Sequence, residues 1–376
     1  MIVHMITDRF SLGGGVEHIY QVVNGIRNIR FTVFARPATT EHQAESRLVR
    51  KKFGSLSHVE LKEDNYSSGY VKKQRPDLIH FHHLLPLFHF YWNPFRKQSI
   101  PVIFTAHGLH IHKYEFSTPS WFKNRLNRIK YLLRFQLEKY LLGRVDRVIA
   151  VSREDQRFME LNYGLNNITY ITNGIVIDKS ITGDTTARIE FRKSLGLPQE
   201  GFLFVTVARF NFQKAYDFLI NTLGSIKHFL DKTGTSFVLV GGGPELDALR
   251  KKATELGLDK RIVFLGERKD SLRLIRAGNV FLLPSRWEGL PIVLLECGLL
   301  KVPVIASDTY GNREIIGAHN GILFENLNSQ DLIHVIKKAV NGEYHWERMT
   351  NCLNREVKQH YSIETMLSKL NSLYNS

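Results

Sequence analysis

The sequence has few cysteines, no long apolar run and no segment of strongly biased composition. Only Cys297 and Cys352 occur among its 376 residues, too few for a disulfide framework, so we expect a reducing compartment. No apolar stretch reaches the roughly 18 residues that a membrane-spanning helix needs. The opening MIVHMITDRF contains an acid and a base, unlike a signal peptide. The sequence therefore predicts a cytoplasmic protein that folds along its whole length.

Positive charge is what the chain has in excess. Lys and Arg total 51 against 36 Asp and Glu, a formal net charge of +15, and the excess is larger in the first half. Such a bias favours phosphate-bearing ligands or an anionic membrane surface through long-range attraction. On charge alone, nucleic acid is also a candidate partner. A chain of this length is expected to form two domains rather than one core.

Short β-rich runs alternate with longer helical patterns along the sequence. The runs IVHMIT, FTVFA, LIHFHH, VIFTAH, RVIAVS and ITYIT come first, and FLFVTV, FVLVGG, IVFLG, VFLLPS and PVIAS follow. This alternation predicts parallel sheets, and the nearly continuous apolar character of the runs predicts helices on both faces. The expected fold class is therefore α/β, with two doubly wound, Rossmann-like domains.

A stretch without strand signals separates the two sets of runs. After Asn173-Gly174, polar, Gly and Pro residues accumulate until FLFVTVA begins. We therefore place an amino-terminal domain at residues 1–178 and a carboxyl-terminal domain at residues 179–360. The last segment has apolar residues at helical spacing, which predicts an amphipathic helix at 361–376 that joins the first domain. Ligands of such sheets bind beyond the carboxyl ends of the strands, so the residues that follow strands are the candidates for a site.

The strongest motif is WEGLPIVLLECG, which follows the run VFLLPS. Glu288 and Glu296 are separated by seven residues, a rise of about 12 Å if the segment is helical. Two carboxylates at this spacing can reach one hydroxyl group on a sugar ring and one on a ribose. The alternative is a pair of unrelated acids, but Glu296 lies in an apolar stretch, where an ionised carboxylate needs a partner. Backbone N–H groups at the start of the helix would face phosphate or sugar oxygens of the same ligand. Gly289, Leu290, Pro291 and Ile292 are therefore candidate residues for binding this phosphate- and sugar-bearing ligand.

Two cationic residues follow the run FLFVTV. Arg209 and Lys214 lie in VARFNFQKAYDF, in a loop that leads to a helix. Two fixed cations there can bind a diphosphate and neutralise the charge that develops when it leaves, which would replace a divalent metal. Arg suits bidentate contact with phosphate oxygens, and Lys acts as a movable point charge. A solvated basic loop is the alternative interpretation.

Strand ends of the first domain carry further candidates. The glycines of SLGGGVEHIY, including Gly14 and Gly15, let the backbone approach a ligand before a helix begins. The segment lacks the G-x-G-x-x-G spacing of dinucleotide-binding turns, and a plain turn is the alternative. His107 in FTAHGLH can offer a neutral or protonated imidazole to a substrate oxygen. The histidines of LIHFHH have no carboxylate or cysteine to complete a zinc pattern, so we expect no metal there.

Two segments, 84–97 and 121–144, mix aromatic and basic residues. In the second, one helix face expected to pack on the core carries Phe122, Leu126, Ile129, Leu133, Leu137 and Tyr140. The expected acceptor or membrane face consists of Trp92 in the first segment and Lys123, Lys130 and Arg134 in the second. This pattern is typical of a packed helix with a solvated face, or of contact with an anionic bilayer or lipid-phosphate acceptor.

Taken together, these motifs resemble glycosyltransferase family 4, retaining enzymes of the GT-B architecture, along essentially the whole chain. The family's E-x7-E is matched by Glu288 and Glu296, its basic pair by Arg209 and Lys214, its glycine turn by Gly14-Gly15 followed by Glu17, and its HG element by His107-Gly108. ITNGI and GGGPE also look similar. One departure is Ala215, where the family commonly has glycine after the lysine, which puts the loop geometry in question.

The resemblance implies a role for each matched residue. Arg209 and Lys214 would hold the donor diphosphate, Glu296 the ribose, Glu288 the donor sugar, His107 a sugar hydroxyl, and Gly15 with its neighbours Gly14 and Glu17 the phosphate region. The implied reaction moves a sugar from a nucleotide-diphosphate donor, expected to be a UDP-sugar, to a saccharide or polyisoprenyl-diphosphate-linked acceptor in surface polysaccharide or glycolipid synthesis.

Neither a cofactor nor a metal is expected from this resemblance, and nucleic acid is not an expected partner. The protein would work in the cytoplasm, with peripheral attachment to the inner face of the cell membrane. Two alternatives stay open. A nucleotide-sugar epimerase of the same architecture would change the donor sugar without an acceptor, and a basic nucleic-acid-binding protein is favoured by charge alone.

Overall fold

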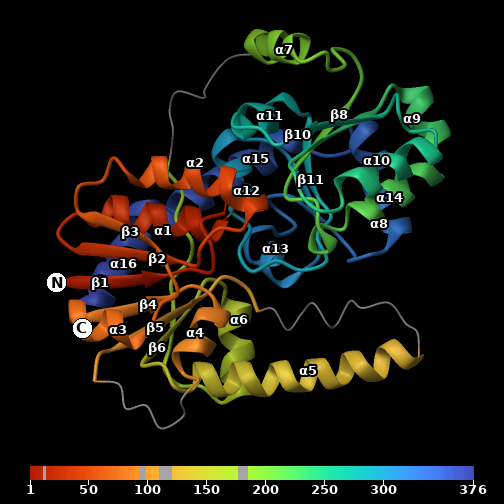
Figure 1. The fold of residues 1–376 in the computed structure, drawn as a ribbon. Helices are drawn as coiled ribbons and strands as arrows, with labels where there is room; N and C mark the ends of the chain where they lie inside the picture. The colour runs from red at the N-terminus through yellow and green to blue at the C-terminus, as the bar shows by residue number, and fades with distance from the viewer. Residues whose placement is uncertain (12–13, 93–98, 110–120, 177–184) are drawn as a thin grey trace. The chain divides into compact units, whose positions relative to one another are not determined.

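The computed structural model describes residues 1–11, 14–92, 99–109, 121–176 and 185–376 (Figure 1). The chain divides into two compact units. The first comprises Met1–Gly174 and Ile363–Ser376, and the second comprises Ile175–Ser362. Each unit is built on a parallel β-sheet with helices on its faces, so the expected α/β class with two Rossmann-like domains is confirmed.

The first unit contains a seven-stranded sheet in the order β3-β2-β1-β4-β5-β6-β7. Its strands are β1 (Ile2–Ile6), β2 (Arg30–Ala35), β3 (Val59–Glu63), β4 (Leu78–Phe81), β5 (Val102–Ala106), β6 (Arg147–Ala150) and β7 (Ile168–Tyr170). Its helices are α1 (Gly14–Gly25), η1 (Thr40–His42), α2 (Gln43–Phe53), α3 (Ser68–Gln74), α4 (Leu84–Phe90), α5 (Trp121–Leu142), α6 (Arg153–Phe158), η3 (Met159–Tyr163) and α16 (Ile363–Tyr374). The order of strands reverses between β1 and β4.

Alternating side chains of the strands feed two apolar layers in the first unit. Val3 and Met5 of β1 pack with α1, α2 and α16 on one face, whereas Ile6 packs with α4 and α5 on the other. Met366 and Leu370 of α16 are completely or almost completely buried in the first of these layers. Figure 1 shows this blue helix beside the red strands, and it explains how the carboxyl end completes the core of the amino-terminal sheet.

The second unit contains a six-stranded sheet in the order β10-β9-β8-β11-β12-β13. Its strands are β8 (Leu203–Val207), β9 (Ser236–Val240), β10 (Ile262–Gly266), β11 (Val280–Leu283), β12 (Val304–Ser307) and β13 (Ile322–Phe324). Its helices are α7 (Thr185–Ser194), η5 (Phe212–Lys214), α8 (Tyr216–Ser225), α9 (Lys227–Thr233), α10 (Leu246–Glu255), α11 (Ser271–Ala277), α12 (Ile292–Leu300), α13 (Tyr310–Ile315), α14 (Ser329–Val340) and α15 (Trp346–His360). Here the order reverses between β8 and β11.

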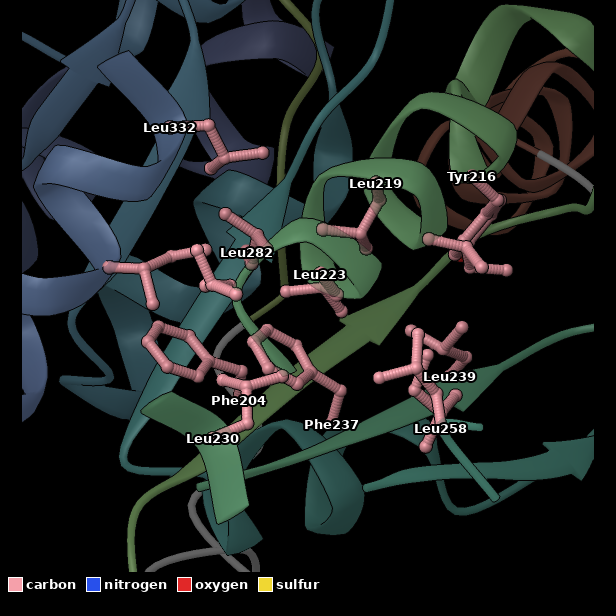
Figure 2. Packing of buried hydrophobic residues seen from close by; sticks show 14 of the residues in the cluster. Phe204, Tyr216, Leu219, Leu223, Leu230, Phe237, Leu239, Leu258, Leu282 and Leu332 are labelled. Carbon is pink, nitrogen blue, oxygen red and sulfur yellow. The ribbon is translucent and has the colours of Figure 1, made fainter. Parts of the chain in front are cut away.

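One apolar layer of the second unit lies between the sheet and helices α8, α9, α10 and α14. The rings of Phe204 on β8 and Phe237 on β9 stack with their centroids 4.8 Å apart. Leu223 and Leu230 pack over them, and Leu282 of β11 continues the layer (Figure 2). Each such side chain contributes about 1.5–3 kcal/mol to folding through burial. This rigid platform holds the loops that follow β8 and β11.

The helix α5 packs on the core with a face that overlaps the predicted one only in part. Ile129, Leu133 and Tyr140 are 49%, 67% and 46% exposed, so the predicted core-facing stripe is wrong at these positions. Leu137 packs towards the core as predicted, together with Phe135 and the buried Leu141. Phe122 and Leu126 lie outside the described side chains. Among the described residues, no helix combines the length and apolar character required to cross a bilayer.

A buried carboxylate explains the orientation of α5. Glu138 has no exposed side-chain surface, and it accepts hydrogen bonds from Arg134 Nε at 2.6 Å and from the Tyr163 hydroxyl at 2.9 Å. A buried charge needs such partners. The helix therefore turns its Glu138 face inwards and leaves apolar residues outside, which apolar periodicity alone does not predict.

Candidate functional site

The predicted cation and carboxylate of the second unit meet at the point where its strand order reverses. Lys214 lies in the loop after β8, and Glu288 lies in the loop after β11. The Lys214 ammonium donates to Glu288 Oε1 at 2.6 Å, with side-chain exposures of 18% and 6%. In sheets of this class the crevice at the reversal point is where ligands bind. The structure thus brings together two of the four predicted catalytic residues.

The loop that carries Lys214 has a fixed conformation. Asn211 caps the short helix η5, and its side-chain oxygen accepts a hydrogen bond from the Lys214 backbone N–H at 3.3 Å. Ala215 follows with φ of +53°, in the left-handed region that favours glycine. Ala215 therefore adopts the left-handed conformation that glycine adopts most readily. The replacement of the family's usual glycine by alanine is compatible with the loop geometry.

Arg286 joins the loops after β8 and β11, and no sequence motif identified it. Its guanidinium donates to the Phe212 carbonyl oxygen at 2.5 Å and to Asp217 Oδ2 at 2.8 Å, and it lies 4.0 Å from the centre of the Phe212 ring. Its backbone N–H donates to the Gln213 carbonyl at 2.7 Å. Arg286 thus binds both sides of the short helix that presents Lys214. Its position directly after the run VFLLPS was the available signal.

Gln213 is a second residue that the motifs did not identify. Its amide nitrogen donates to the Trp287 carbonyl at 3.0 Å and lies 3.5 Å from Glu288 Oε2. The two loops are therefore connected by an ion pair, a guanidinium and an amide. Such cross-linking holds charged groups in place before a ligand arrives, which is the condition for electrostatic catalysis.

Glu288 precedes the helix rather than lying on it. The helix α12 begins at Ile292 with Pro291 as its N-cap, which agrees with the expected helix start, so the rise expected for a fully helical segment does not apply between the two carboxylates. Glu296 lies within α12 and is half-buried, while Leu290 is 5% exposed. Pro291 suits this position because its φ of −73° lies in the range that extended and helical backbone share.

Close backbone contacts at glycines hold the Glu288 loop against the start of α13. A Cβ atom at Gly311, in the first turn of α13, would lie 2.0 Å from the Gly289 carbonyl oxygen and 2.8 Å from the Glu288 carbonyl carbon. Only a residue without a side chain allows this approach. The same device supports the loop after β8, because a Cβ atom at Gly241 would lie 2.0 Å from the Ala208 carbonyl oxygen.

Arg209 lies on the surface next to these loops. Its side chain is exposed, and within the described part of the chain it has no ion-pair or hydrogen-bond partner. The neighbouring Phe210 is fully buried, and its backbone N–H donates to the Gly242 carbonyl at 2.7 Å. The backbone of Arg209 is therefore anchored while its guanidinium points to solvent, an arrangement suited to capturing an anion.

In the first unit, Gly15 and His107 come together with His83, a histidine of LIHFHH to which the sequence assigned no site role. A Cβ atom at Gly15 would lie 3.6 Å from His83 Cε1 and 3.9 Å from His107 Cδ2. The Thr7 hydroxyl, just after β1, lies 3.1 Å from His83 Nδ1. These residues follow β1, β4 and β5, so this cluster also surrounds the reversal point of its sheet.

His107 is half-buried and lies against the buried imidazoles of His18 and His82. Its Nε2 lies 3.0 Å from His82 Nδ1, and its ring contacts that of His18 edge to face at 5.0 Å. Burial, followed by the neighbouring imidazoles of His18, His83 and His80, lowers the pKa of His107 well below its ordinary value. His107 is therefore neutral at physiological pH, and it can act as a hydrogen-bond partner but not as a fixed cation.

The remaining predicted residues occupy varied positions. Gly14 is the exposed first residue of α1. Glu17 forms an ion pair with Lys52 of α2 at 2.5 Å. Trp92 is 72% exposed and Lys130 is exposed, whereas Arg134 is committed to the buried Glu138. The side chain of Lys123 lies outside the described part of the structure.

A hollow of about 320 Å³, including space open to solvent, lies at the carboxyl edge of the first sheet. Its polar lining consists of Thr7, Arg36, Asp64, Asn65, Tyr66 and His89. Because Thr7 also contacts His83, the hollow adjoins the cluster around His107. Hydroxyl, amide, carboxylate and aromatic groups are the side chains that hydrogen-bond and stack on sugar rings.

Two family profiles match this chain. Residues 12–179 match "Glycosyltransferase Family 4", and residues 187–356 match "Glycosyl transferases group 1". Together they cover both units, and the chain belongs to glycosyltransferase family 4. It is a glycosyltransferase of the GT-B architecture.

Curated relatives and solved structures agree with this assignment. The chain is 26% identical to an Escherichia coli UDP-Gal:α-D-GlcNAc-diphosphoundecaprenol α-1,3-galactosyltransferase, over 81% of this chain and 76% of that one. It is 28% identical to the putative teichuronic acid biosynthesis glycosyltransferase TuaC of Bacillus subtilis, over 71% of this chain and 62% of that one. Its fold is similar to that of Anabaena HepE, crystallised with UDP-glucose, with a TM-score of 0.80, 19% identity and coverage of 100% of this chain and 99% of that one.

Proposed function

We propose that this glycosyltransferase moves a sugar from a UDP-sugar to a saccharide or lipid-linked saccharide, with retention of anomeric configuration and without a metal. The observation that carries the proposal is the Lys214–Glu288 pair at the strand-order reversal of the second unit. The E. coli relative is named for a UDP-galactose donor, and HepE was crystallised with UDP-glucose, which supports the choice of base.

In the proposed reaction, Arg209 and Lys214 bind the donor diphosphate. The glycosyl–phosphate bond breaks through an oxocarbenium-like state, and the departing phosphate accepts the proton of the acceptor hydroxyl, which attacks from the same face. Negative charge grows on the diphosphate as this bond breaks. Preorganised cations stabilise that charge without reorganising, and they supply what a divalent metal would otherwise supply. Glu288 and Glu296 accept hydrogen bonds from donor hydroxyl groups.

The diphosphate assignment is tested by Arg209→Ala and Lys214→Ala. We expect each to lower kcat by about 10²- to 10³-fold, because each removes one positive charge that stabilises the diphosphate in the transition state. A panel of UDP-sugars is first screened for the donor that raises the unfolding temperature most. Turnover is then measured with that donor. His334→Gln, which replaces an exposed residue of α14, serves as the control. Near-normal turnover in both alanine variants would refute the assignment, and conversion of the donor without an acceptor would instead reveal an epimerase.

For the acceptor, we propose a lipid-linked saccharide that is reached at an anionic membrane surface. Ile129, Leu132 and Leu133 of α5 are 49%, 57% and 67% exposed, and the exposed Lys130 lies beside them. A helix with adjacent apolar and basic side chains binds at the headgroup level of anionic bilayers. The hollow near Thr7 would then hold the sugar part of the acceptor. The diphosphoundecaprenol acceptor in the name of the E. coli relative supports this class.

Vesicle sedimentation tests the membrane proposal. We expect the protein to bind vesicles that contain anionic lipid at low salt, and to bind neutral vesicles weakly. Lys130→Gln together with Leu133→Ser should weaken binding at least tenfold, because both the charge and the apolar contact are reduced. Lys251→Gln, which changes an exposed lysine on α10, is the control. Equal binding by all three proteins would exclude α5 as the membrane contact.

A further inference from the structure

A group of three potential metal ligands lies on the second unit, away from the residues assigned to the transfer reaction. His319, in the loop between α13 and β13, approaches Cys352 and Glu356 of α15. One ligand atom from each residue lies within 4.8 Å of the other two. The His319 Nε2 to Glu356 Oε1 distance is 2.8 Å, and the Cys352 Sγ to Glu356 Oε1 distance is 3.7 Å.

Helical spacing and a rigid loop hold this group together. Cys352 and Glu356 are four residues apart, so their side chains lie on the same face of α15. Asn320 fixes the loop, because its side-chain oxygen accepts from the Gly317 N–H at 2.8 Å and its amide donates to the Ile315 carbonyl at 3.0 Å. The neighbouring His319 is thus presented to α15 by a loop whose backbone is already ordered.

The outer contacts resemble those of metal ligands. The Asn320 amide also donates to Glu356 Oε2 at 2.5 Å, which leaves Oε1 facing His319 and Cys352. Metal-ligating carboxylates are typically oriented by such second partners.

We propose that His319, Cys352 and Glu356 bind one Zn²⁺ ion, with water as the fourth ligand. Thiolate, imidazole and carboxylate are the ligands zinc takes, at about 2.0 to 2.3 Å. Tetrahedral bonds of these lengths place ligand atoms about 3.3 to 3.7 Å apart. The Cys352 sulfur is already at this spacing from Glu356 Oε1, and the distance from His319 Nε2 to Glu356 Oε1 needs to lengthen by about half an ångström. The Cys352 thiol loses its proton to the buffer on binding, so affinity rises with pH.

The expected role of the ion is structural. It would link the loop at 317–321 to α15. This helix packs on α12, because Asn354 of α15 donates a hydrogen bond to the Gly298 carbonyl of α12 at 2.8 Å. The helices α12, α13 and α15 all belong to the second unit. Zinc would therefore stabilise the second unit without contacting Lys214 or Glu288. The ion would take no part in the sugar-transfer reaction.

Zinc titration of the full-length, reduced protein tests this site. We expect one equivalent of Zn²⁺ to bind, to raise the unfolding temperature, and to release protons that calorimetry detects in buffers of different ionisation heat. Co²⁺ in its place should show thiolate charge-transfer absorption. Cys352→Ser and His319→Gln should each weaken binding by more than the roughly 10- to 100-fold that loss of an outer partner costs. His334→Gln should bind as the wild type does.

A measurement on the unaltered protein guards against variants that fail to fold. Cys297 is buried and Cys352 is half-buried, so a thiol-alkylating reagent reports mainly on Cys352. Zinc should slow this alkylation, followed by mass spectrometry. Unchanged alkylation, the absence of a charge-transfer band, or equal zinc affinity in Cys352→Ser would each overturn the proposal. Transferase activity is not the readout, so this result and the proposed function can fail independently.

Discussion

At the scale of single residues, the presentation of Lys214 depends on a side chain outside every recognised motif. Arg286 is 7% exposed and holds the Phe212 carbonyl and Asp217 at once. We expect Arg286→Lys to lower kcat about tenfold and stability by about 1–3 kcal/mol, because a lysine lacks the planar fork that makes both contacts. Steady-state kinetics and chemical unfolding measure the two effects.

Asp217→Asn separates the two contributions of Arg286. It removes the charge on the half-exposed partner of the guanidinium but leaves the contact with Phe212. Its stability should fall, while its kcat should stay within a few-fold of the wild type. If Asp217→Asn lost as much turnover as Arg286→Lys, the effect would come from the ion pair and not from positioning of the η5 segment.

Single residues also show where sequence reasoning succeeds and where it stops. Lys214 and Glu288 could be predicted as neighbours because each follows a strand, and parallel strands end at the same edge. Arg286 and His83 also follow strands, but their importance lies in contacts with Phe212 and Thr7. Those contacts depend on loop conformations that no spacing in the sequence specifies.

At the scale of elements, the loop after β9 supports the loop that carries Arg209. Gly241 has a φ of +142°, and a Cβ atom there would lie 2.0 Å from the Ala208 carbonyl oxygen. We expect Gly241→Ala to destabilise the second unit by at least about 2 kcal/mol and to weaken UDP binding, because the clash moves backbone next to Arg209. Thermal unfolding and calorimetric titration with UDP provide the measurements.

Gly342 offers a matched control for this loop. Its φ is +74°, and a Cβ atom there would have no neighbour within 4 Å among the described residues. Gly342→Ala should therefore cost only about 1 kcal/mol, from backbone strain, and leave UDP binding unchanged. Equal losses in both variants would show that strain, and not the contact with Ala208, determines the effect.

Elements buried on both faces were the easiest to predict. Strands such as β8 and β9 are continuous apolar runs, and the sequence pattern indicates both. The pattern does not indicate β3, which reads VELKE with charged residues, or β13, which has only three residues. Both lie at sheet edges, where a strand needs less apolar character. Edge position alone does not hide a strand, because the edge strands β7 and β10 coincide with the apolar runs ITYIT and IVFLG. For α5, the buried Glu138 overrides the apolar stripe.

At the scale of the whole molecule, the two units differ in their buried histidines. Among the described residues, every fully buried histidine belongs to the first unit: His4, His18, His80 and His82. Burial lowers the pKa of His18 to about 4. Burial and the charge of His18 lower that of His80 to about 3. Sequence composition gives the number of histidines, but their burial depends on packing. Tyr374 of α16 covers His80, whereas Tyr66 and Phe34 cover His4 on the other face of the sheet.

This difference predicts separate responses of the two units to acid. The unfolded chain binds protons at these histidines below about pH 6.5, whereas the folded unit stays neutral until about pH 4 at His18 and about pH 3 at His80. Stability of the first unit is therefore complete above pH 6.5 and falls as the pH drops towards 4, by up to about 1.4 kcal/mol per pH unit for each histidine. Calorimetry from pH 7 to 5 should show one unfolding transition moving to lower temperature faster than the other. His18→Gln should make the unfolding temperature of that transition depend less steeply on pH, because one of the buried histidines is removed. Parallel shifts of both transitions would rule out buried histidines as the cause.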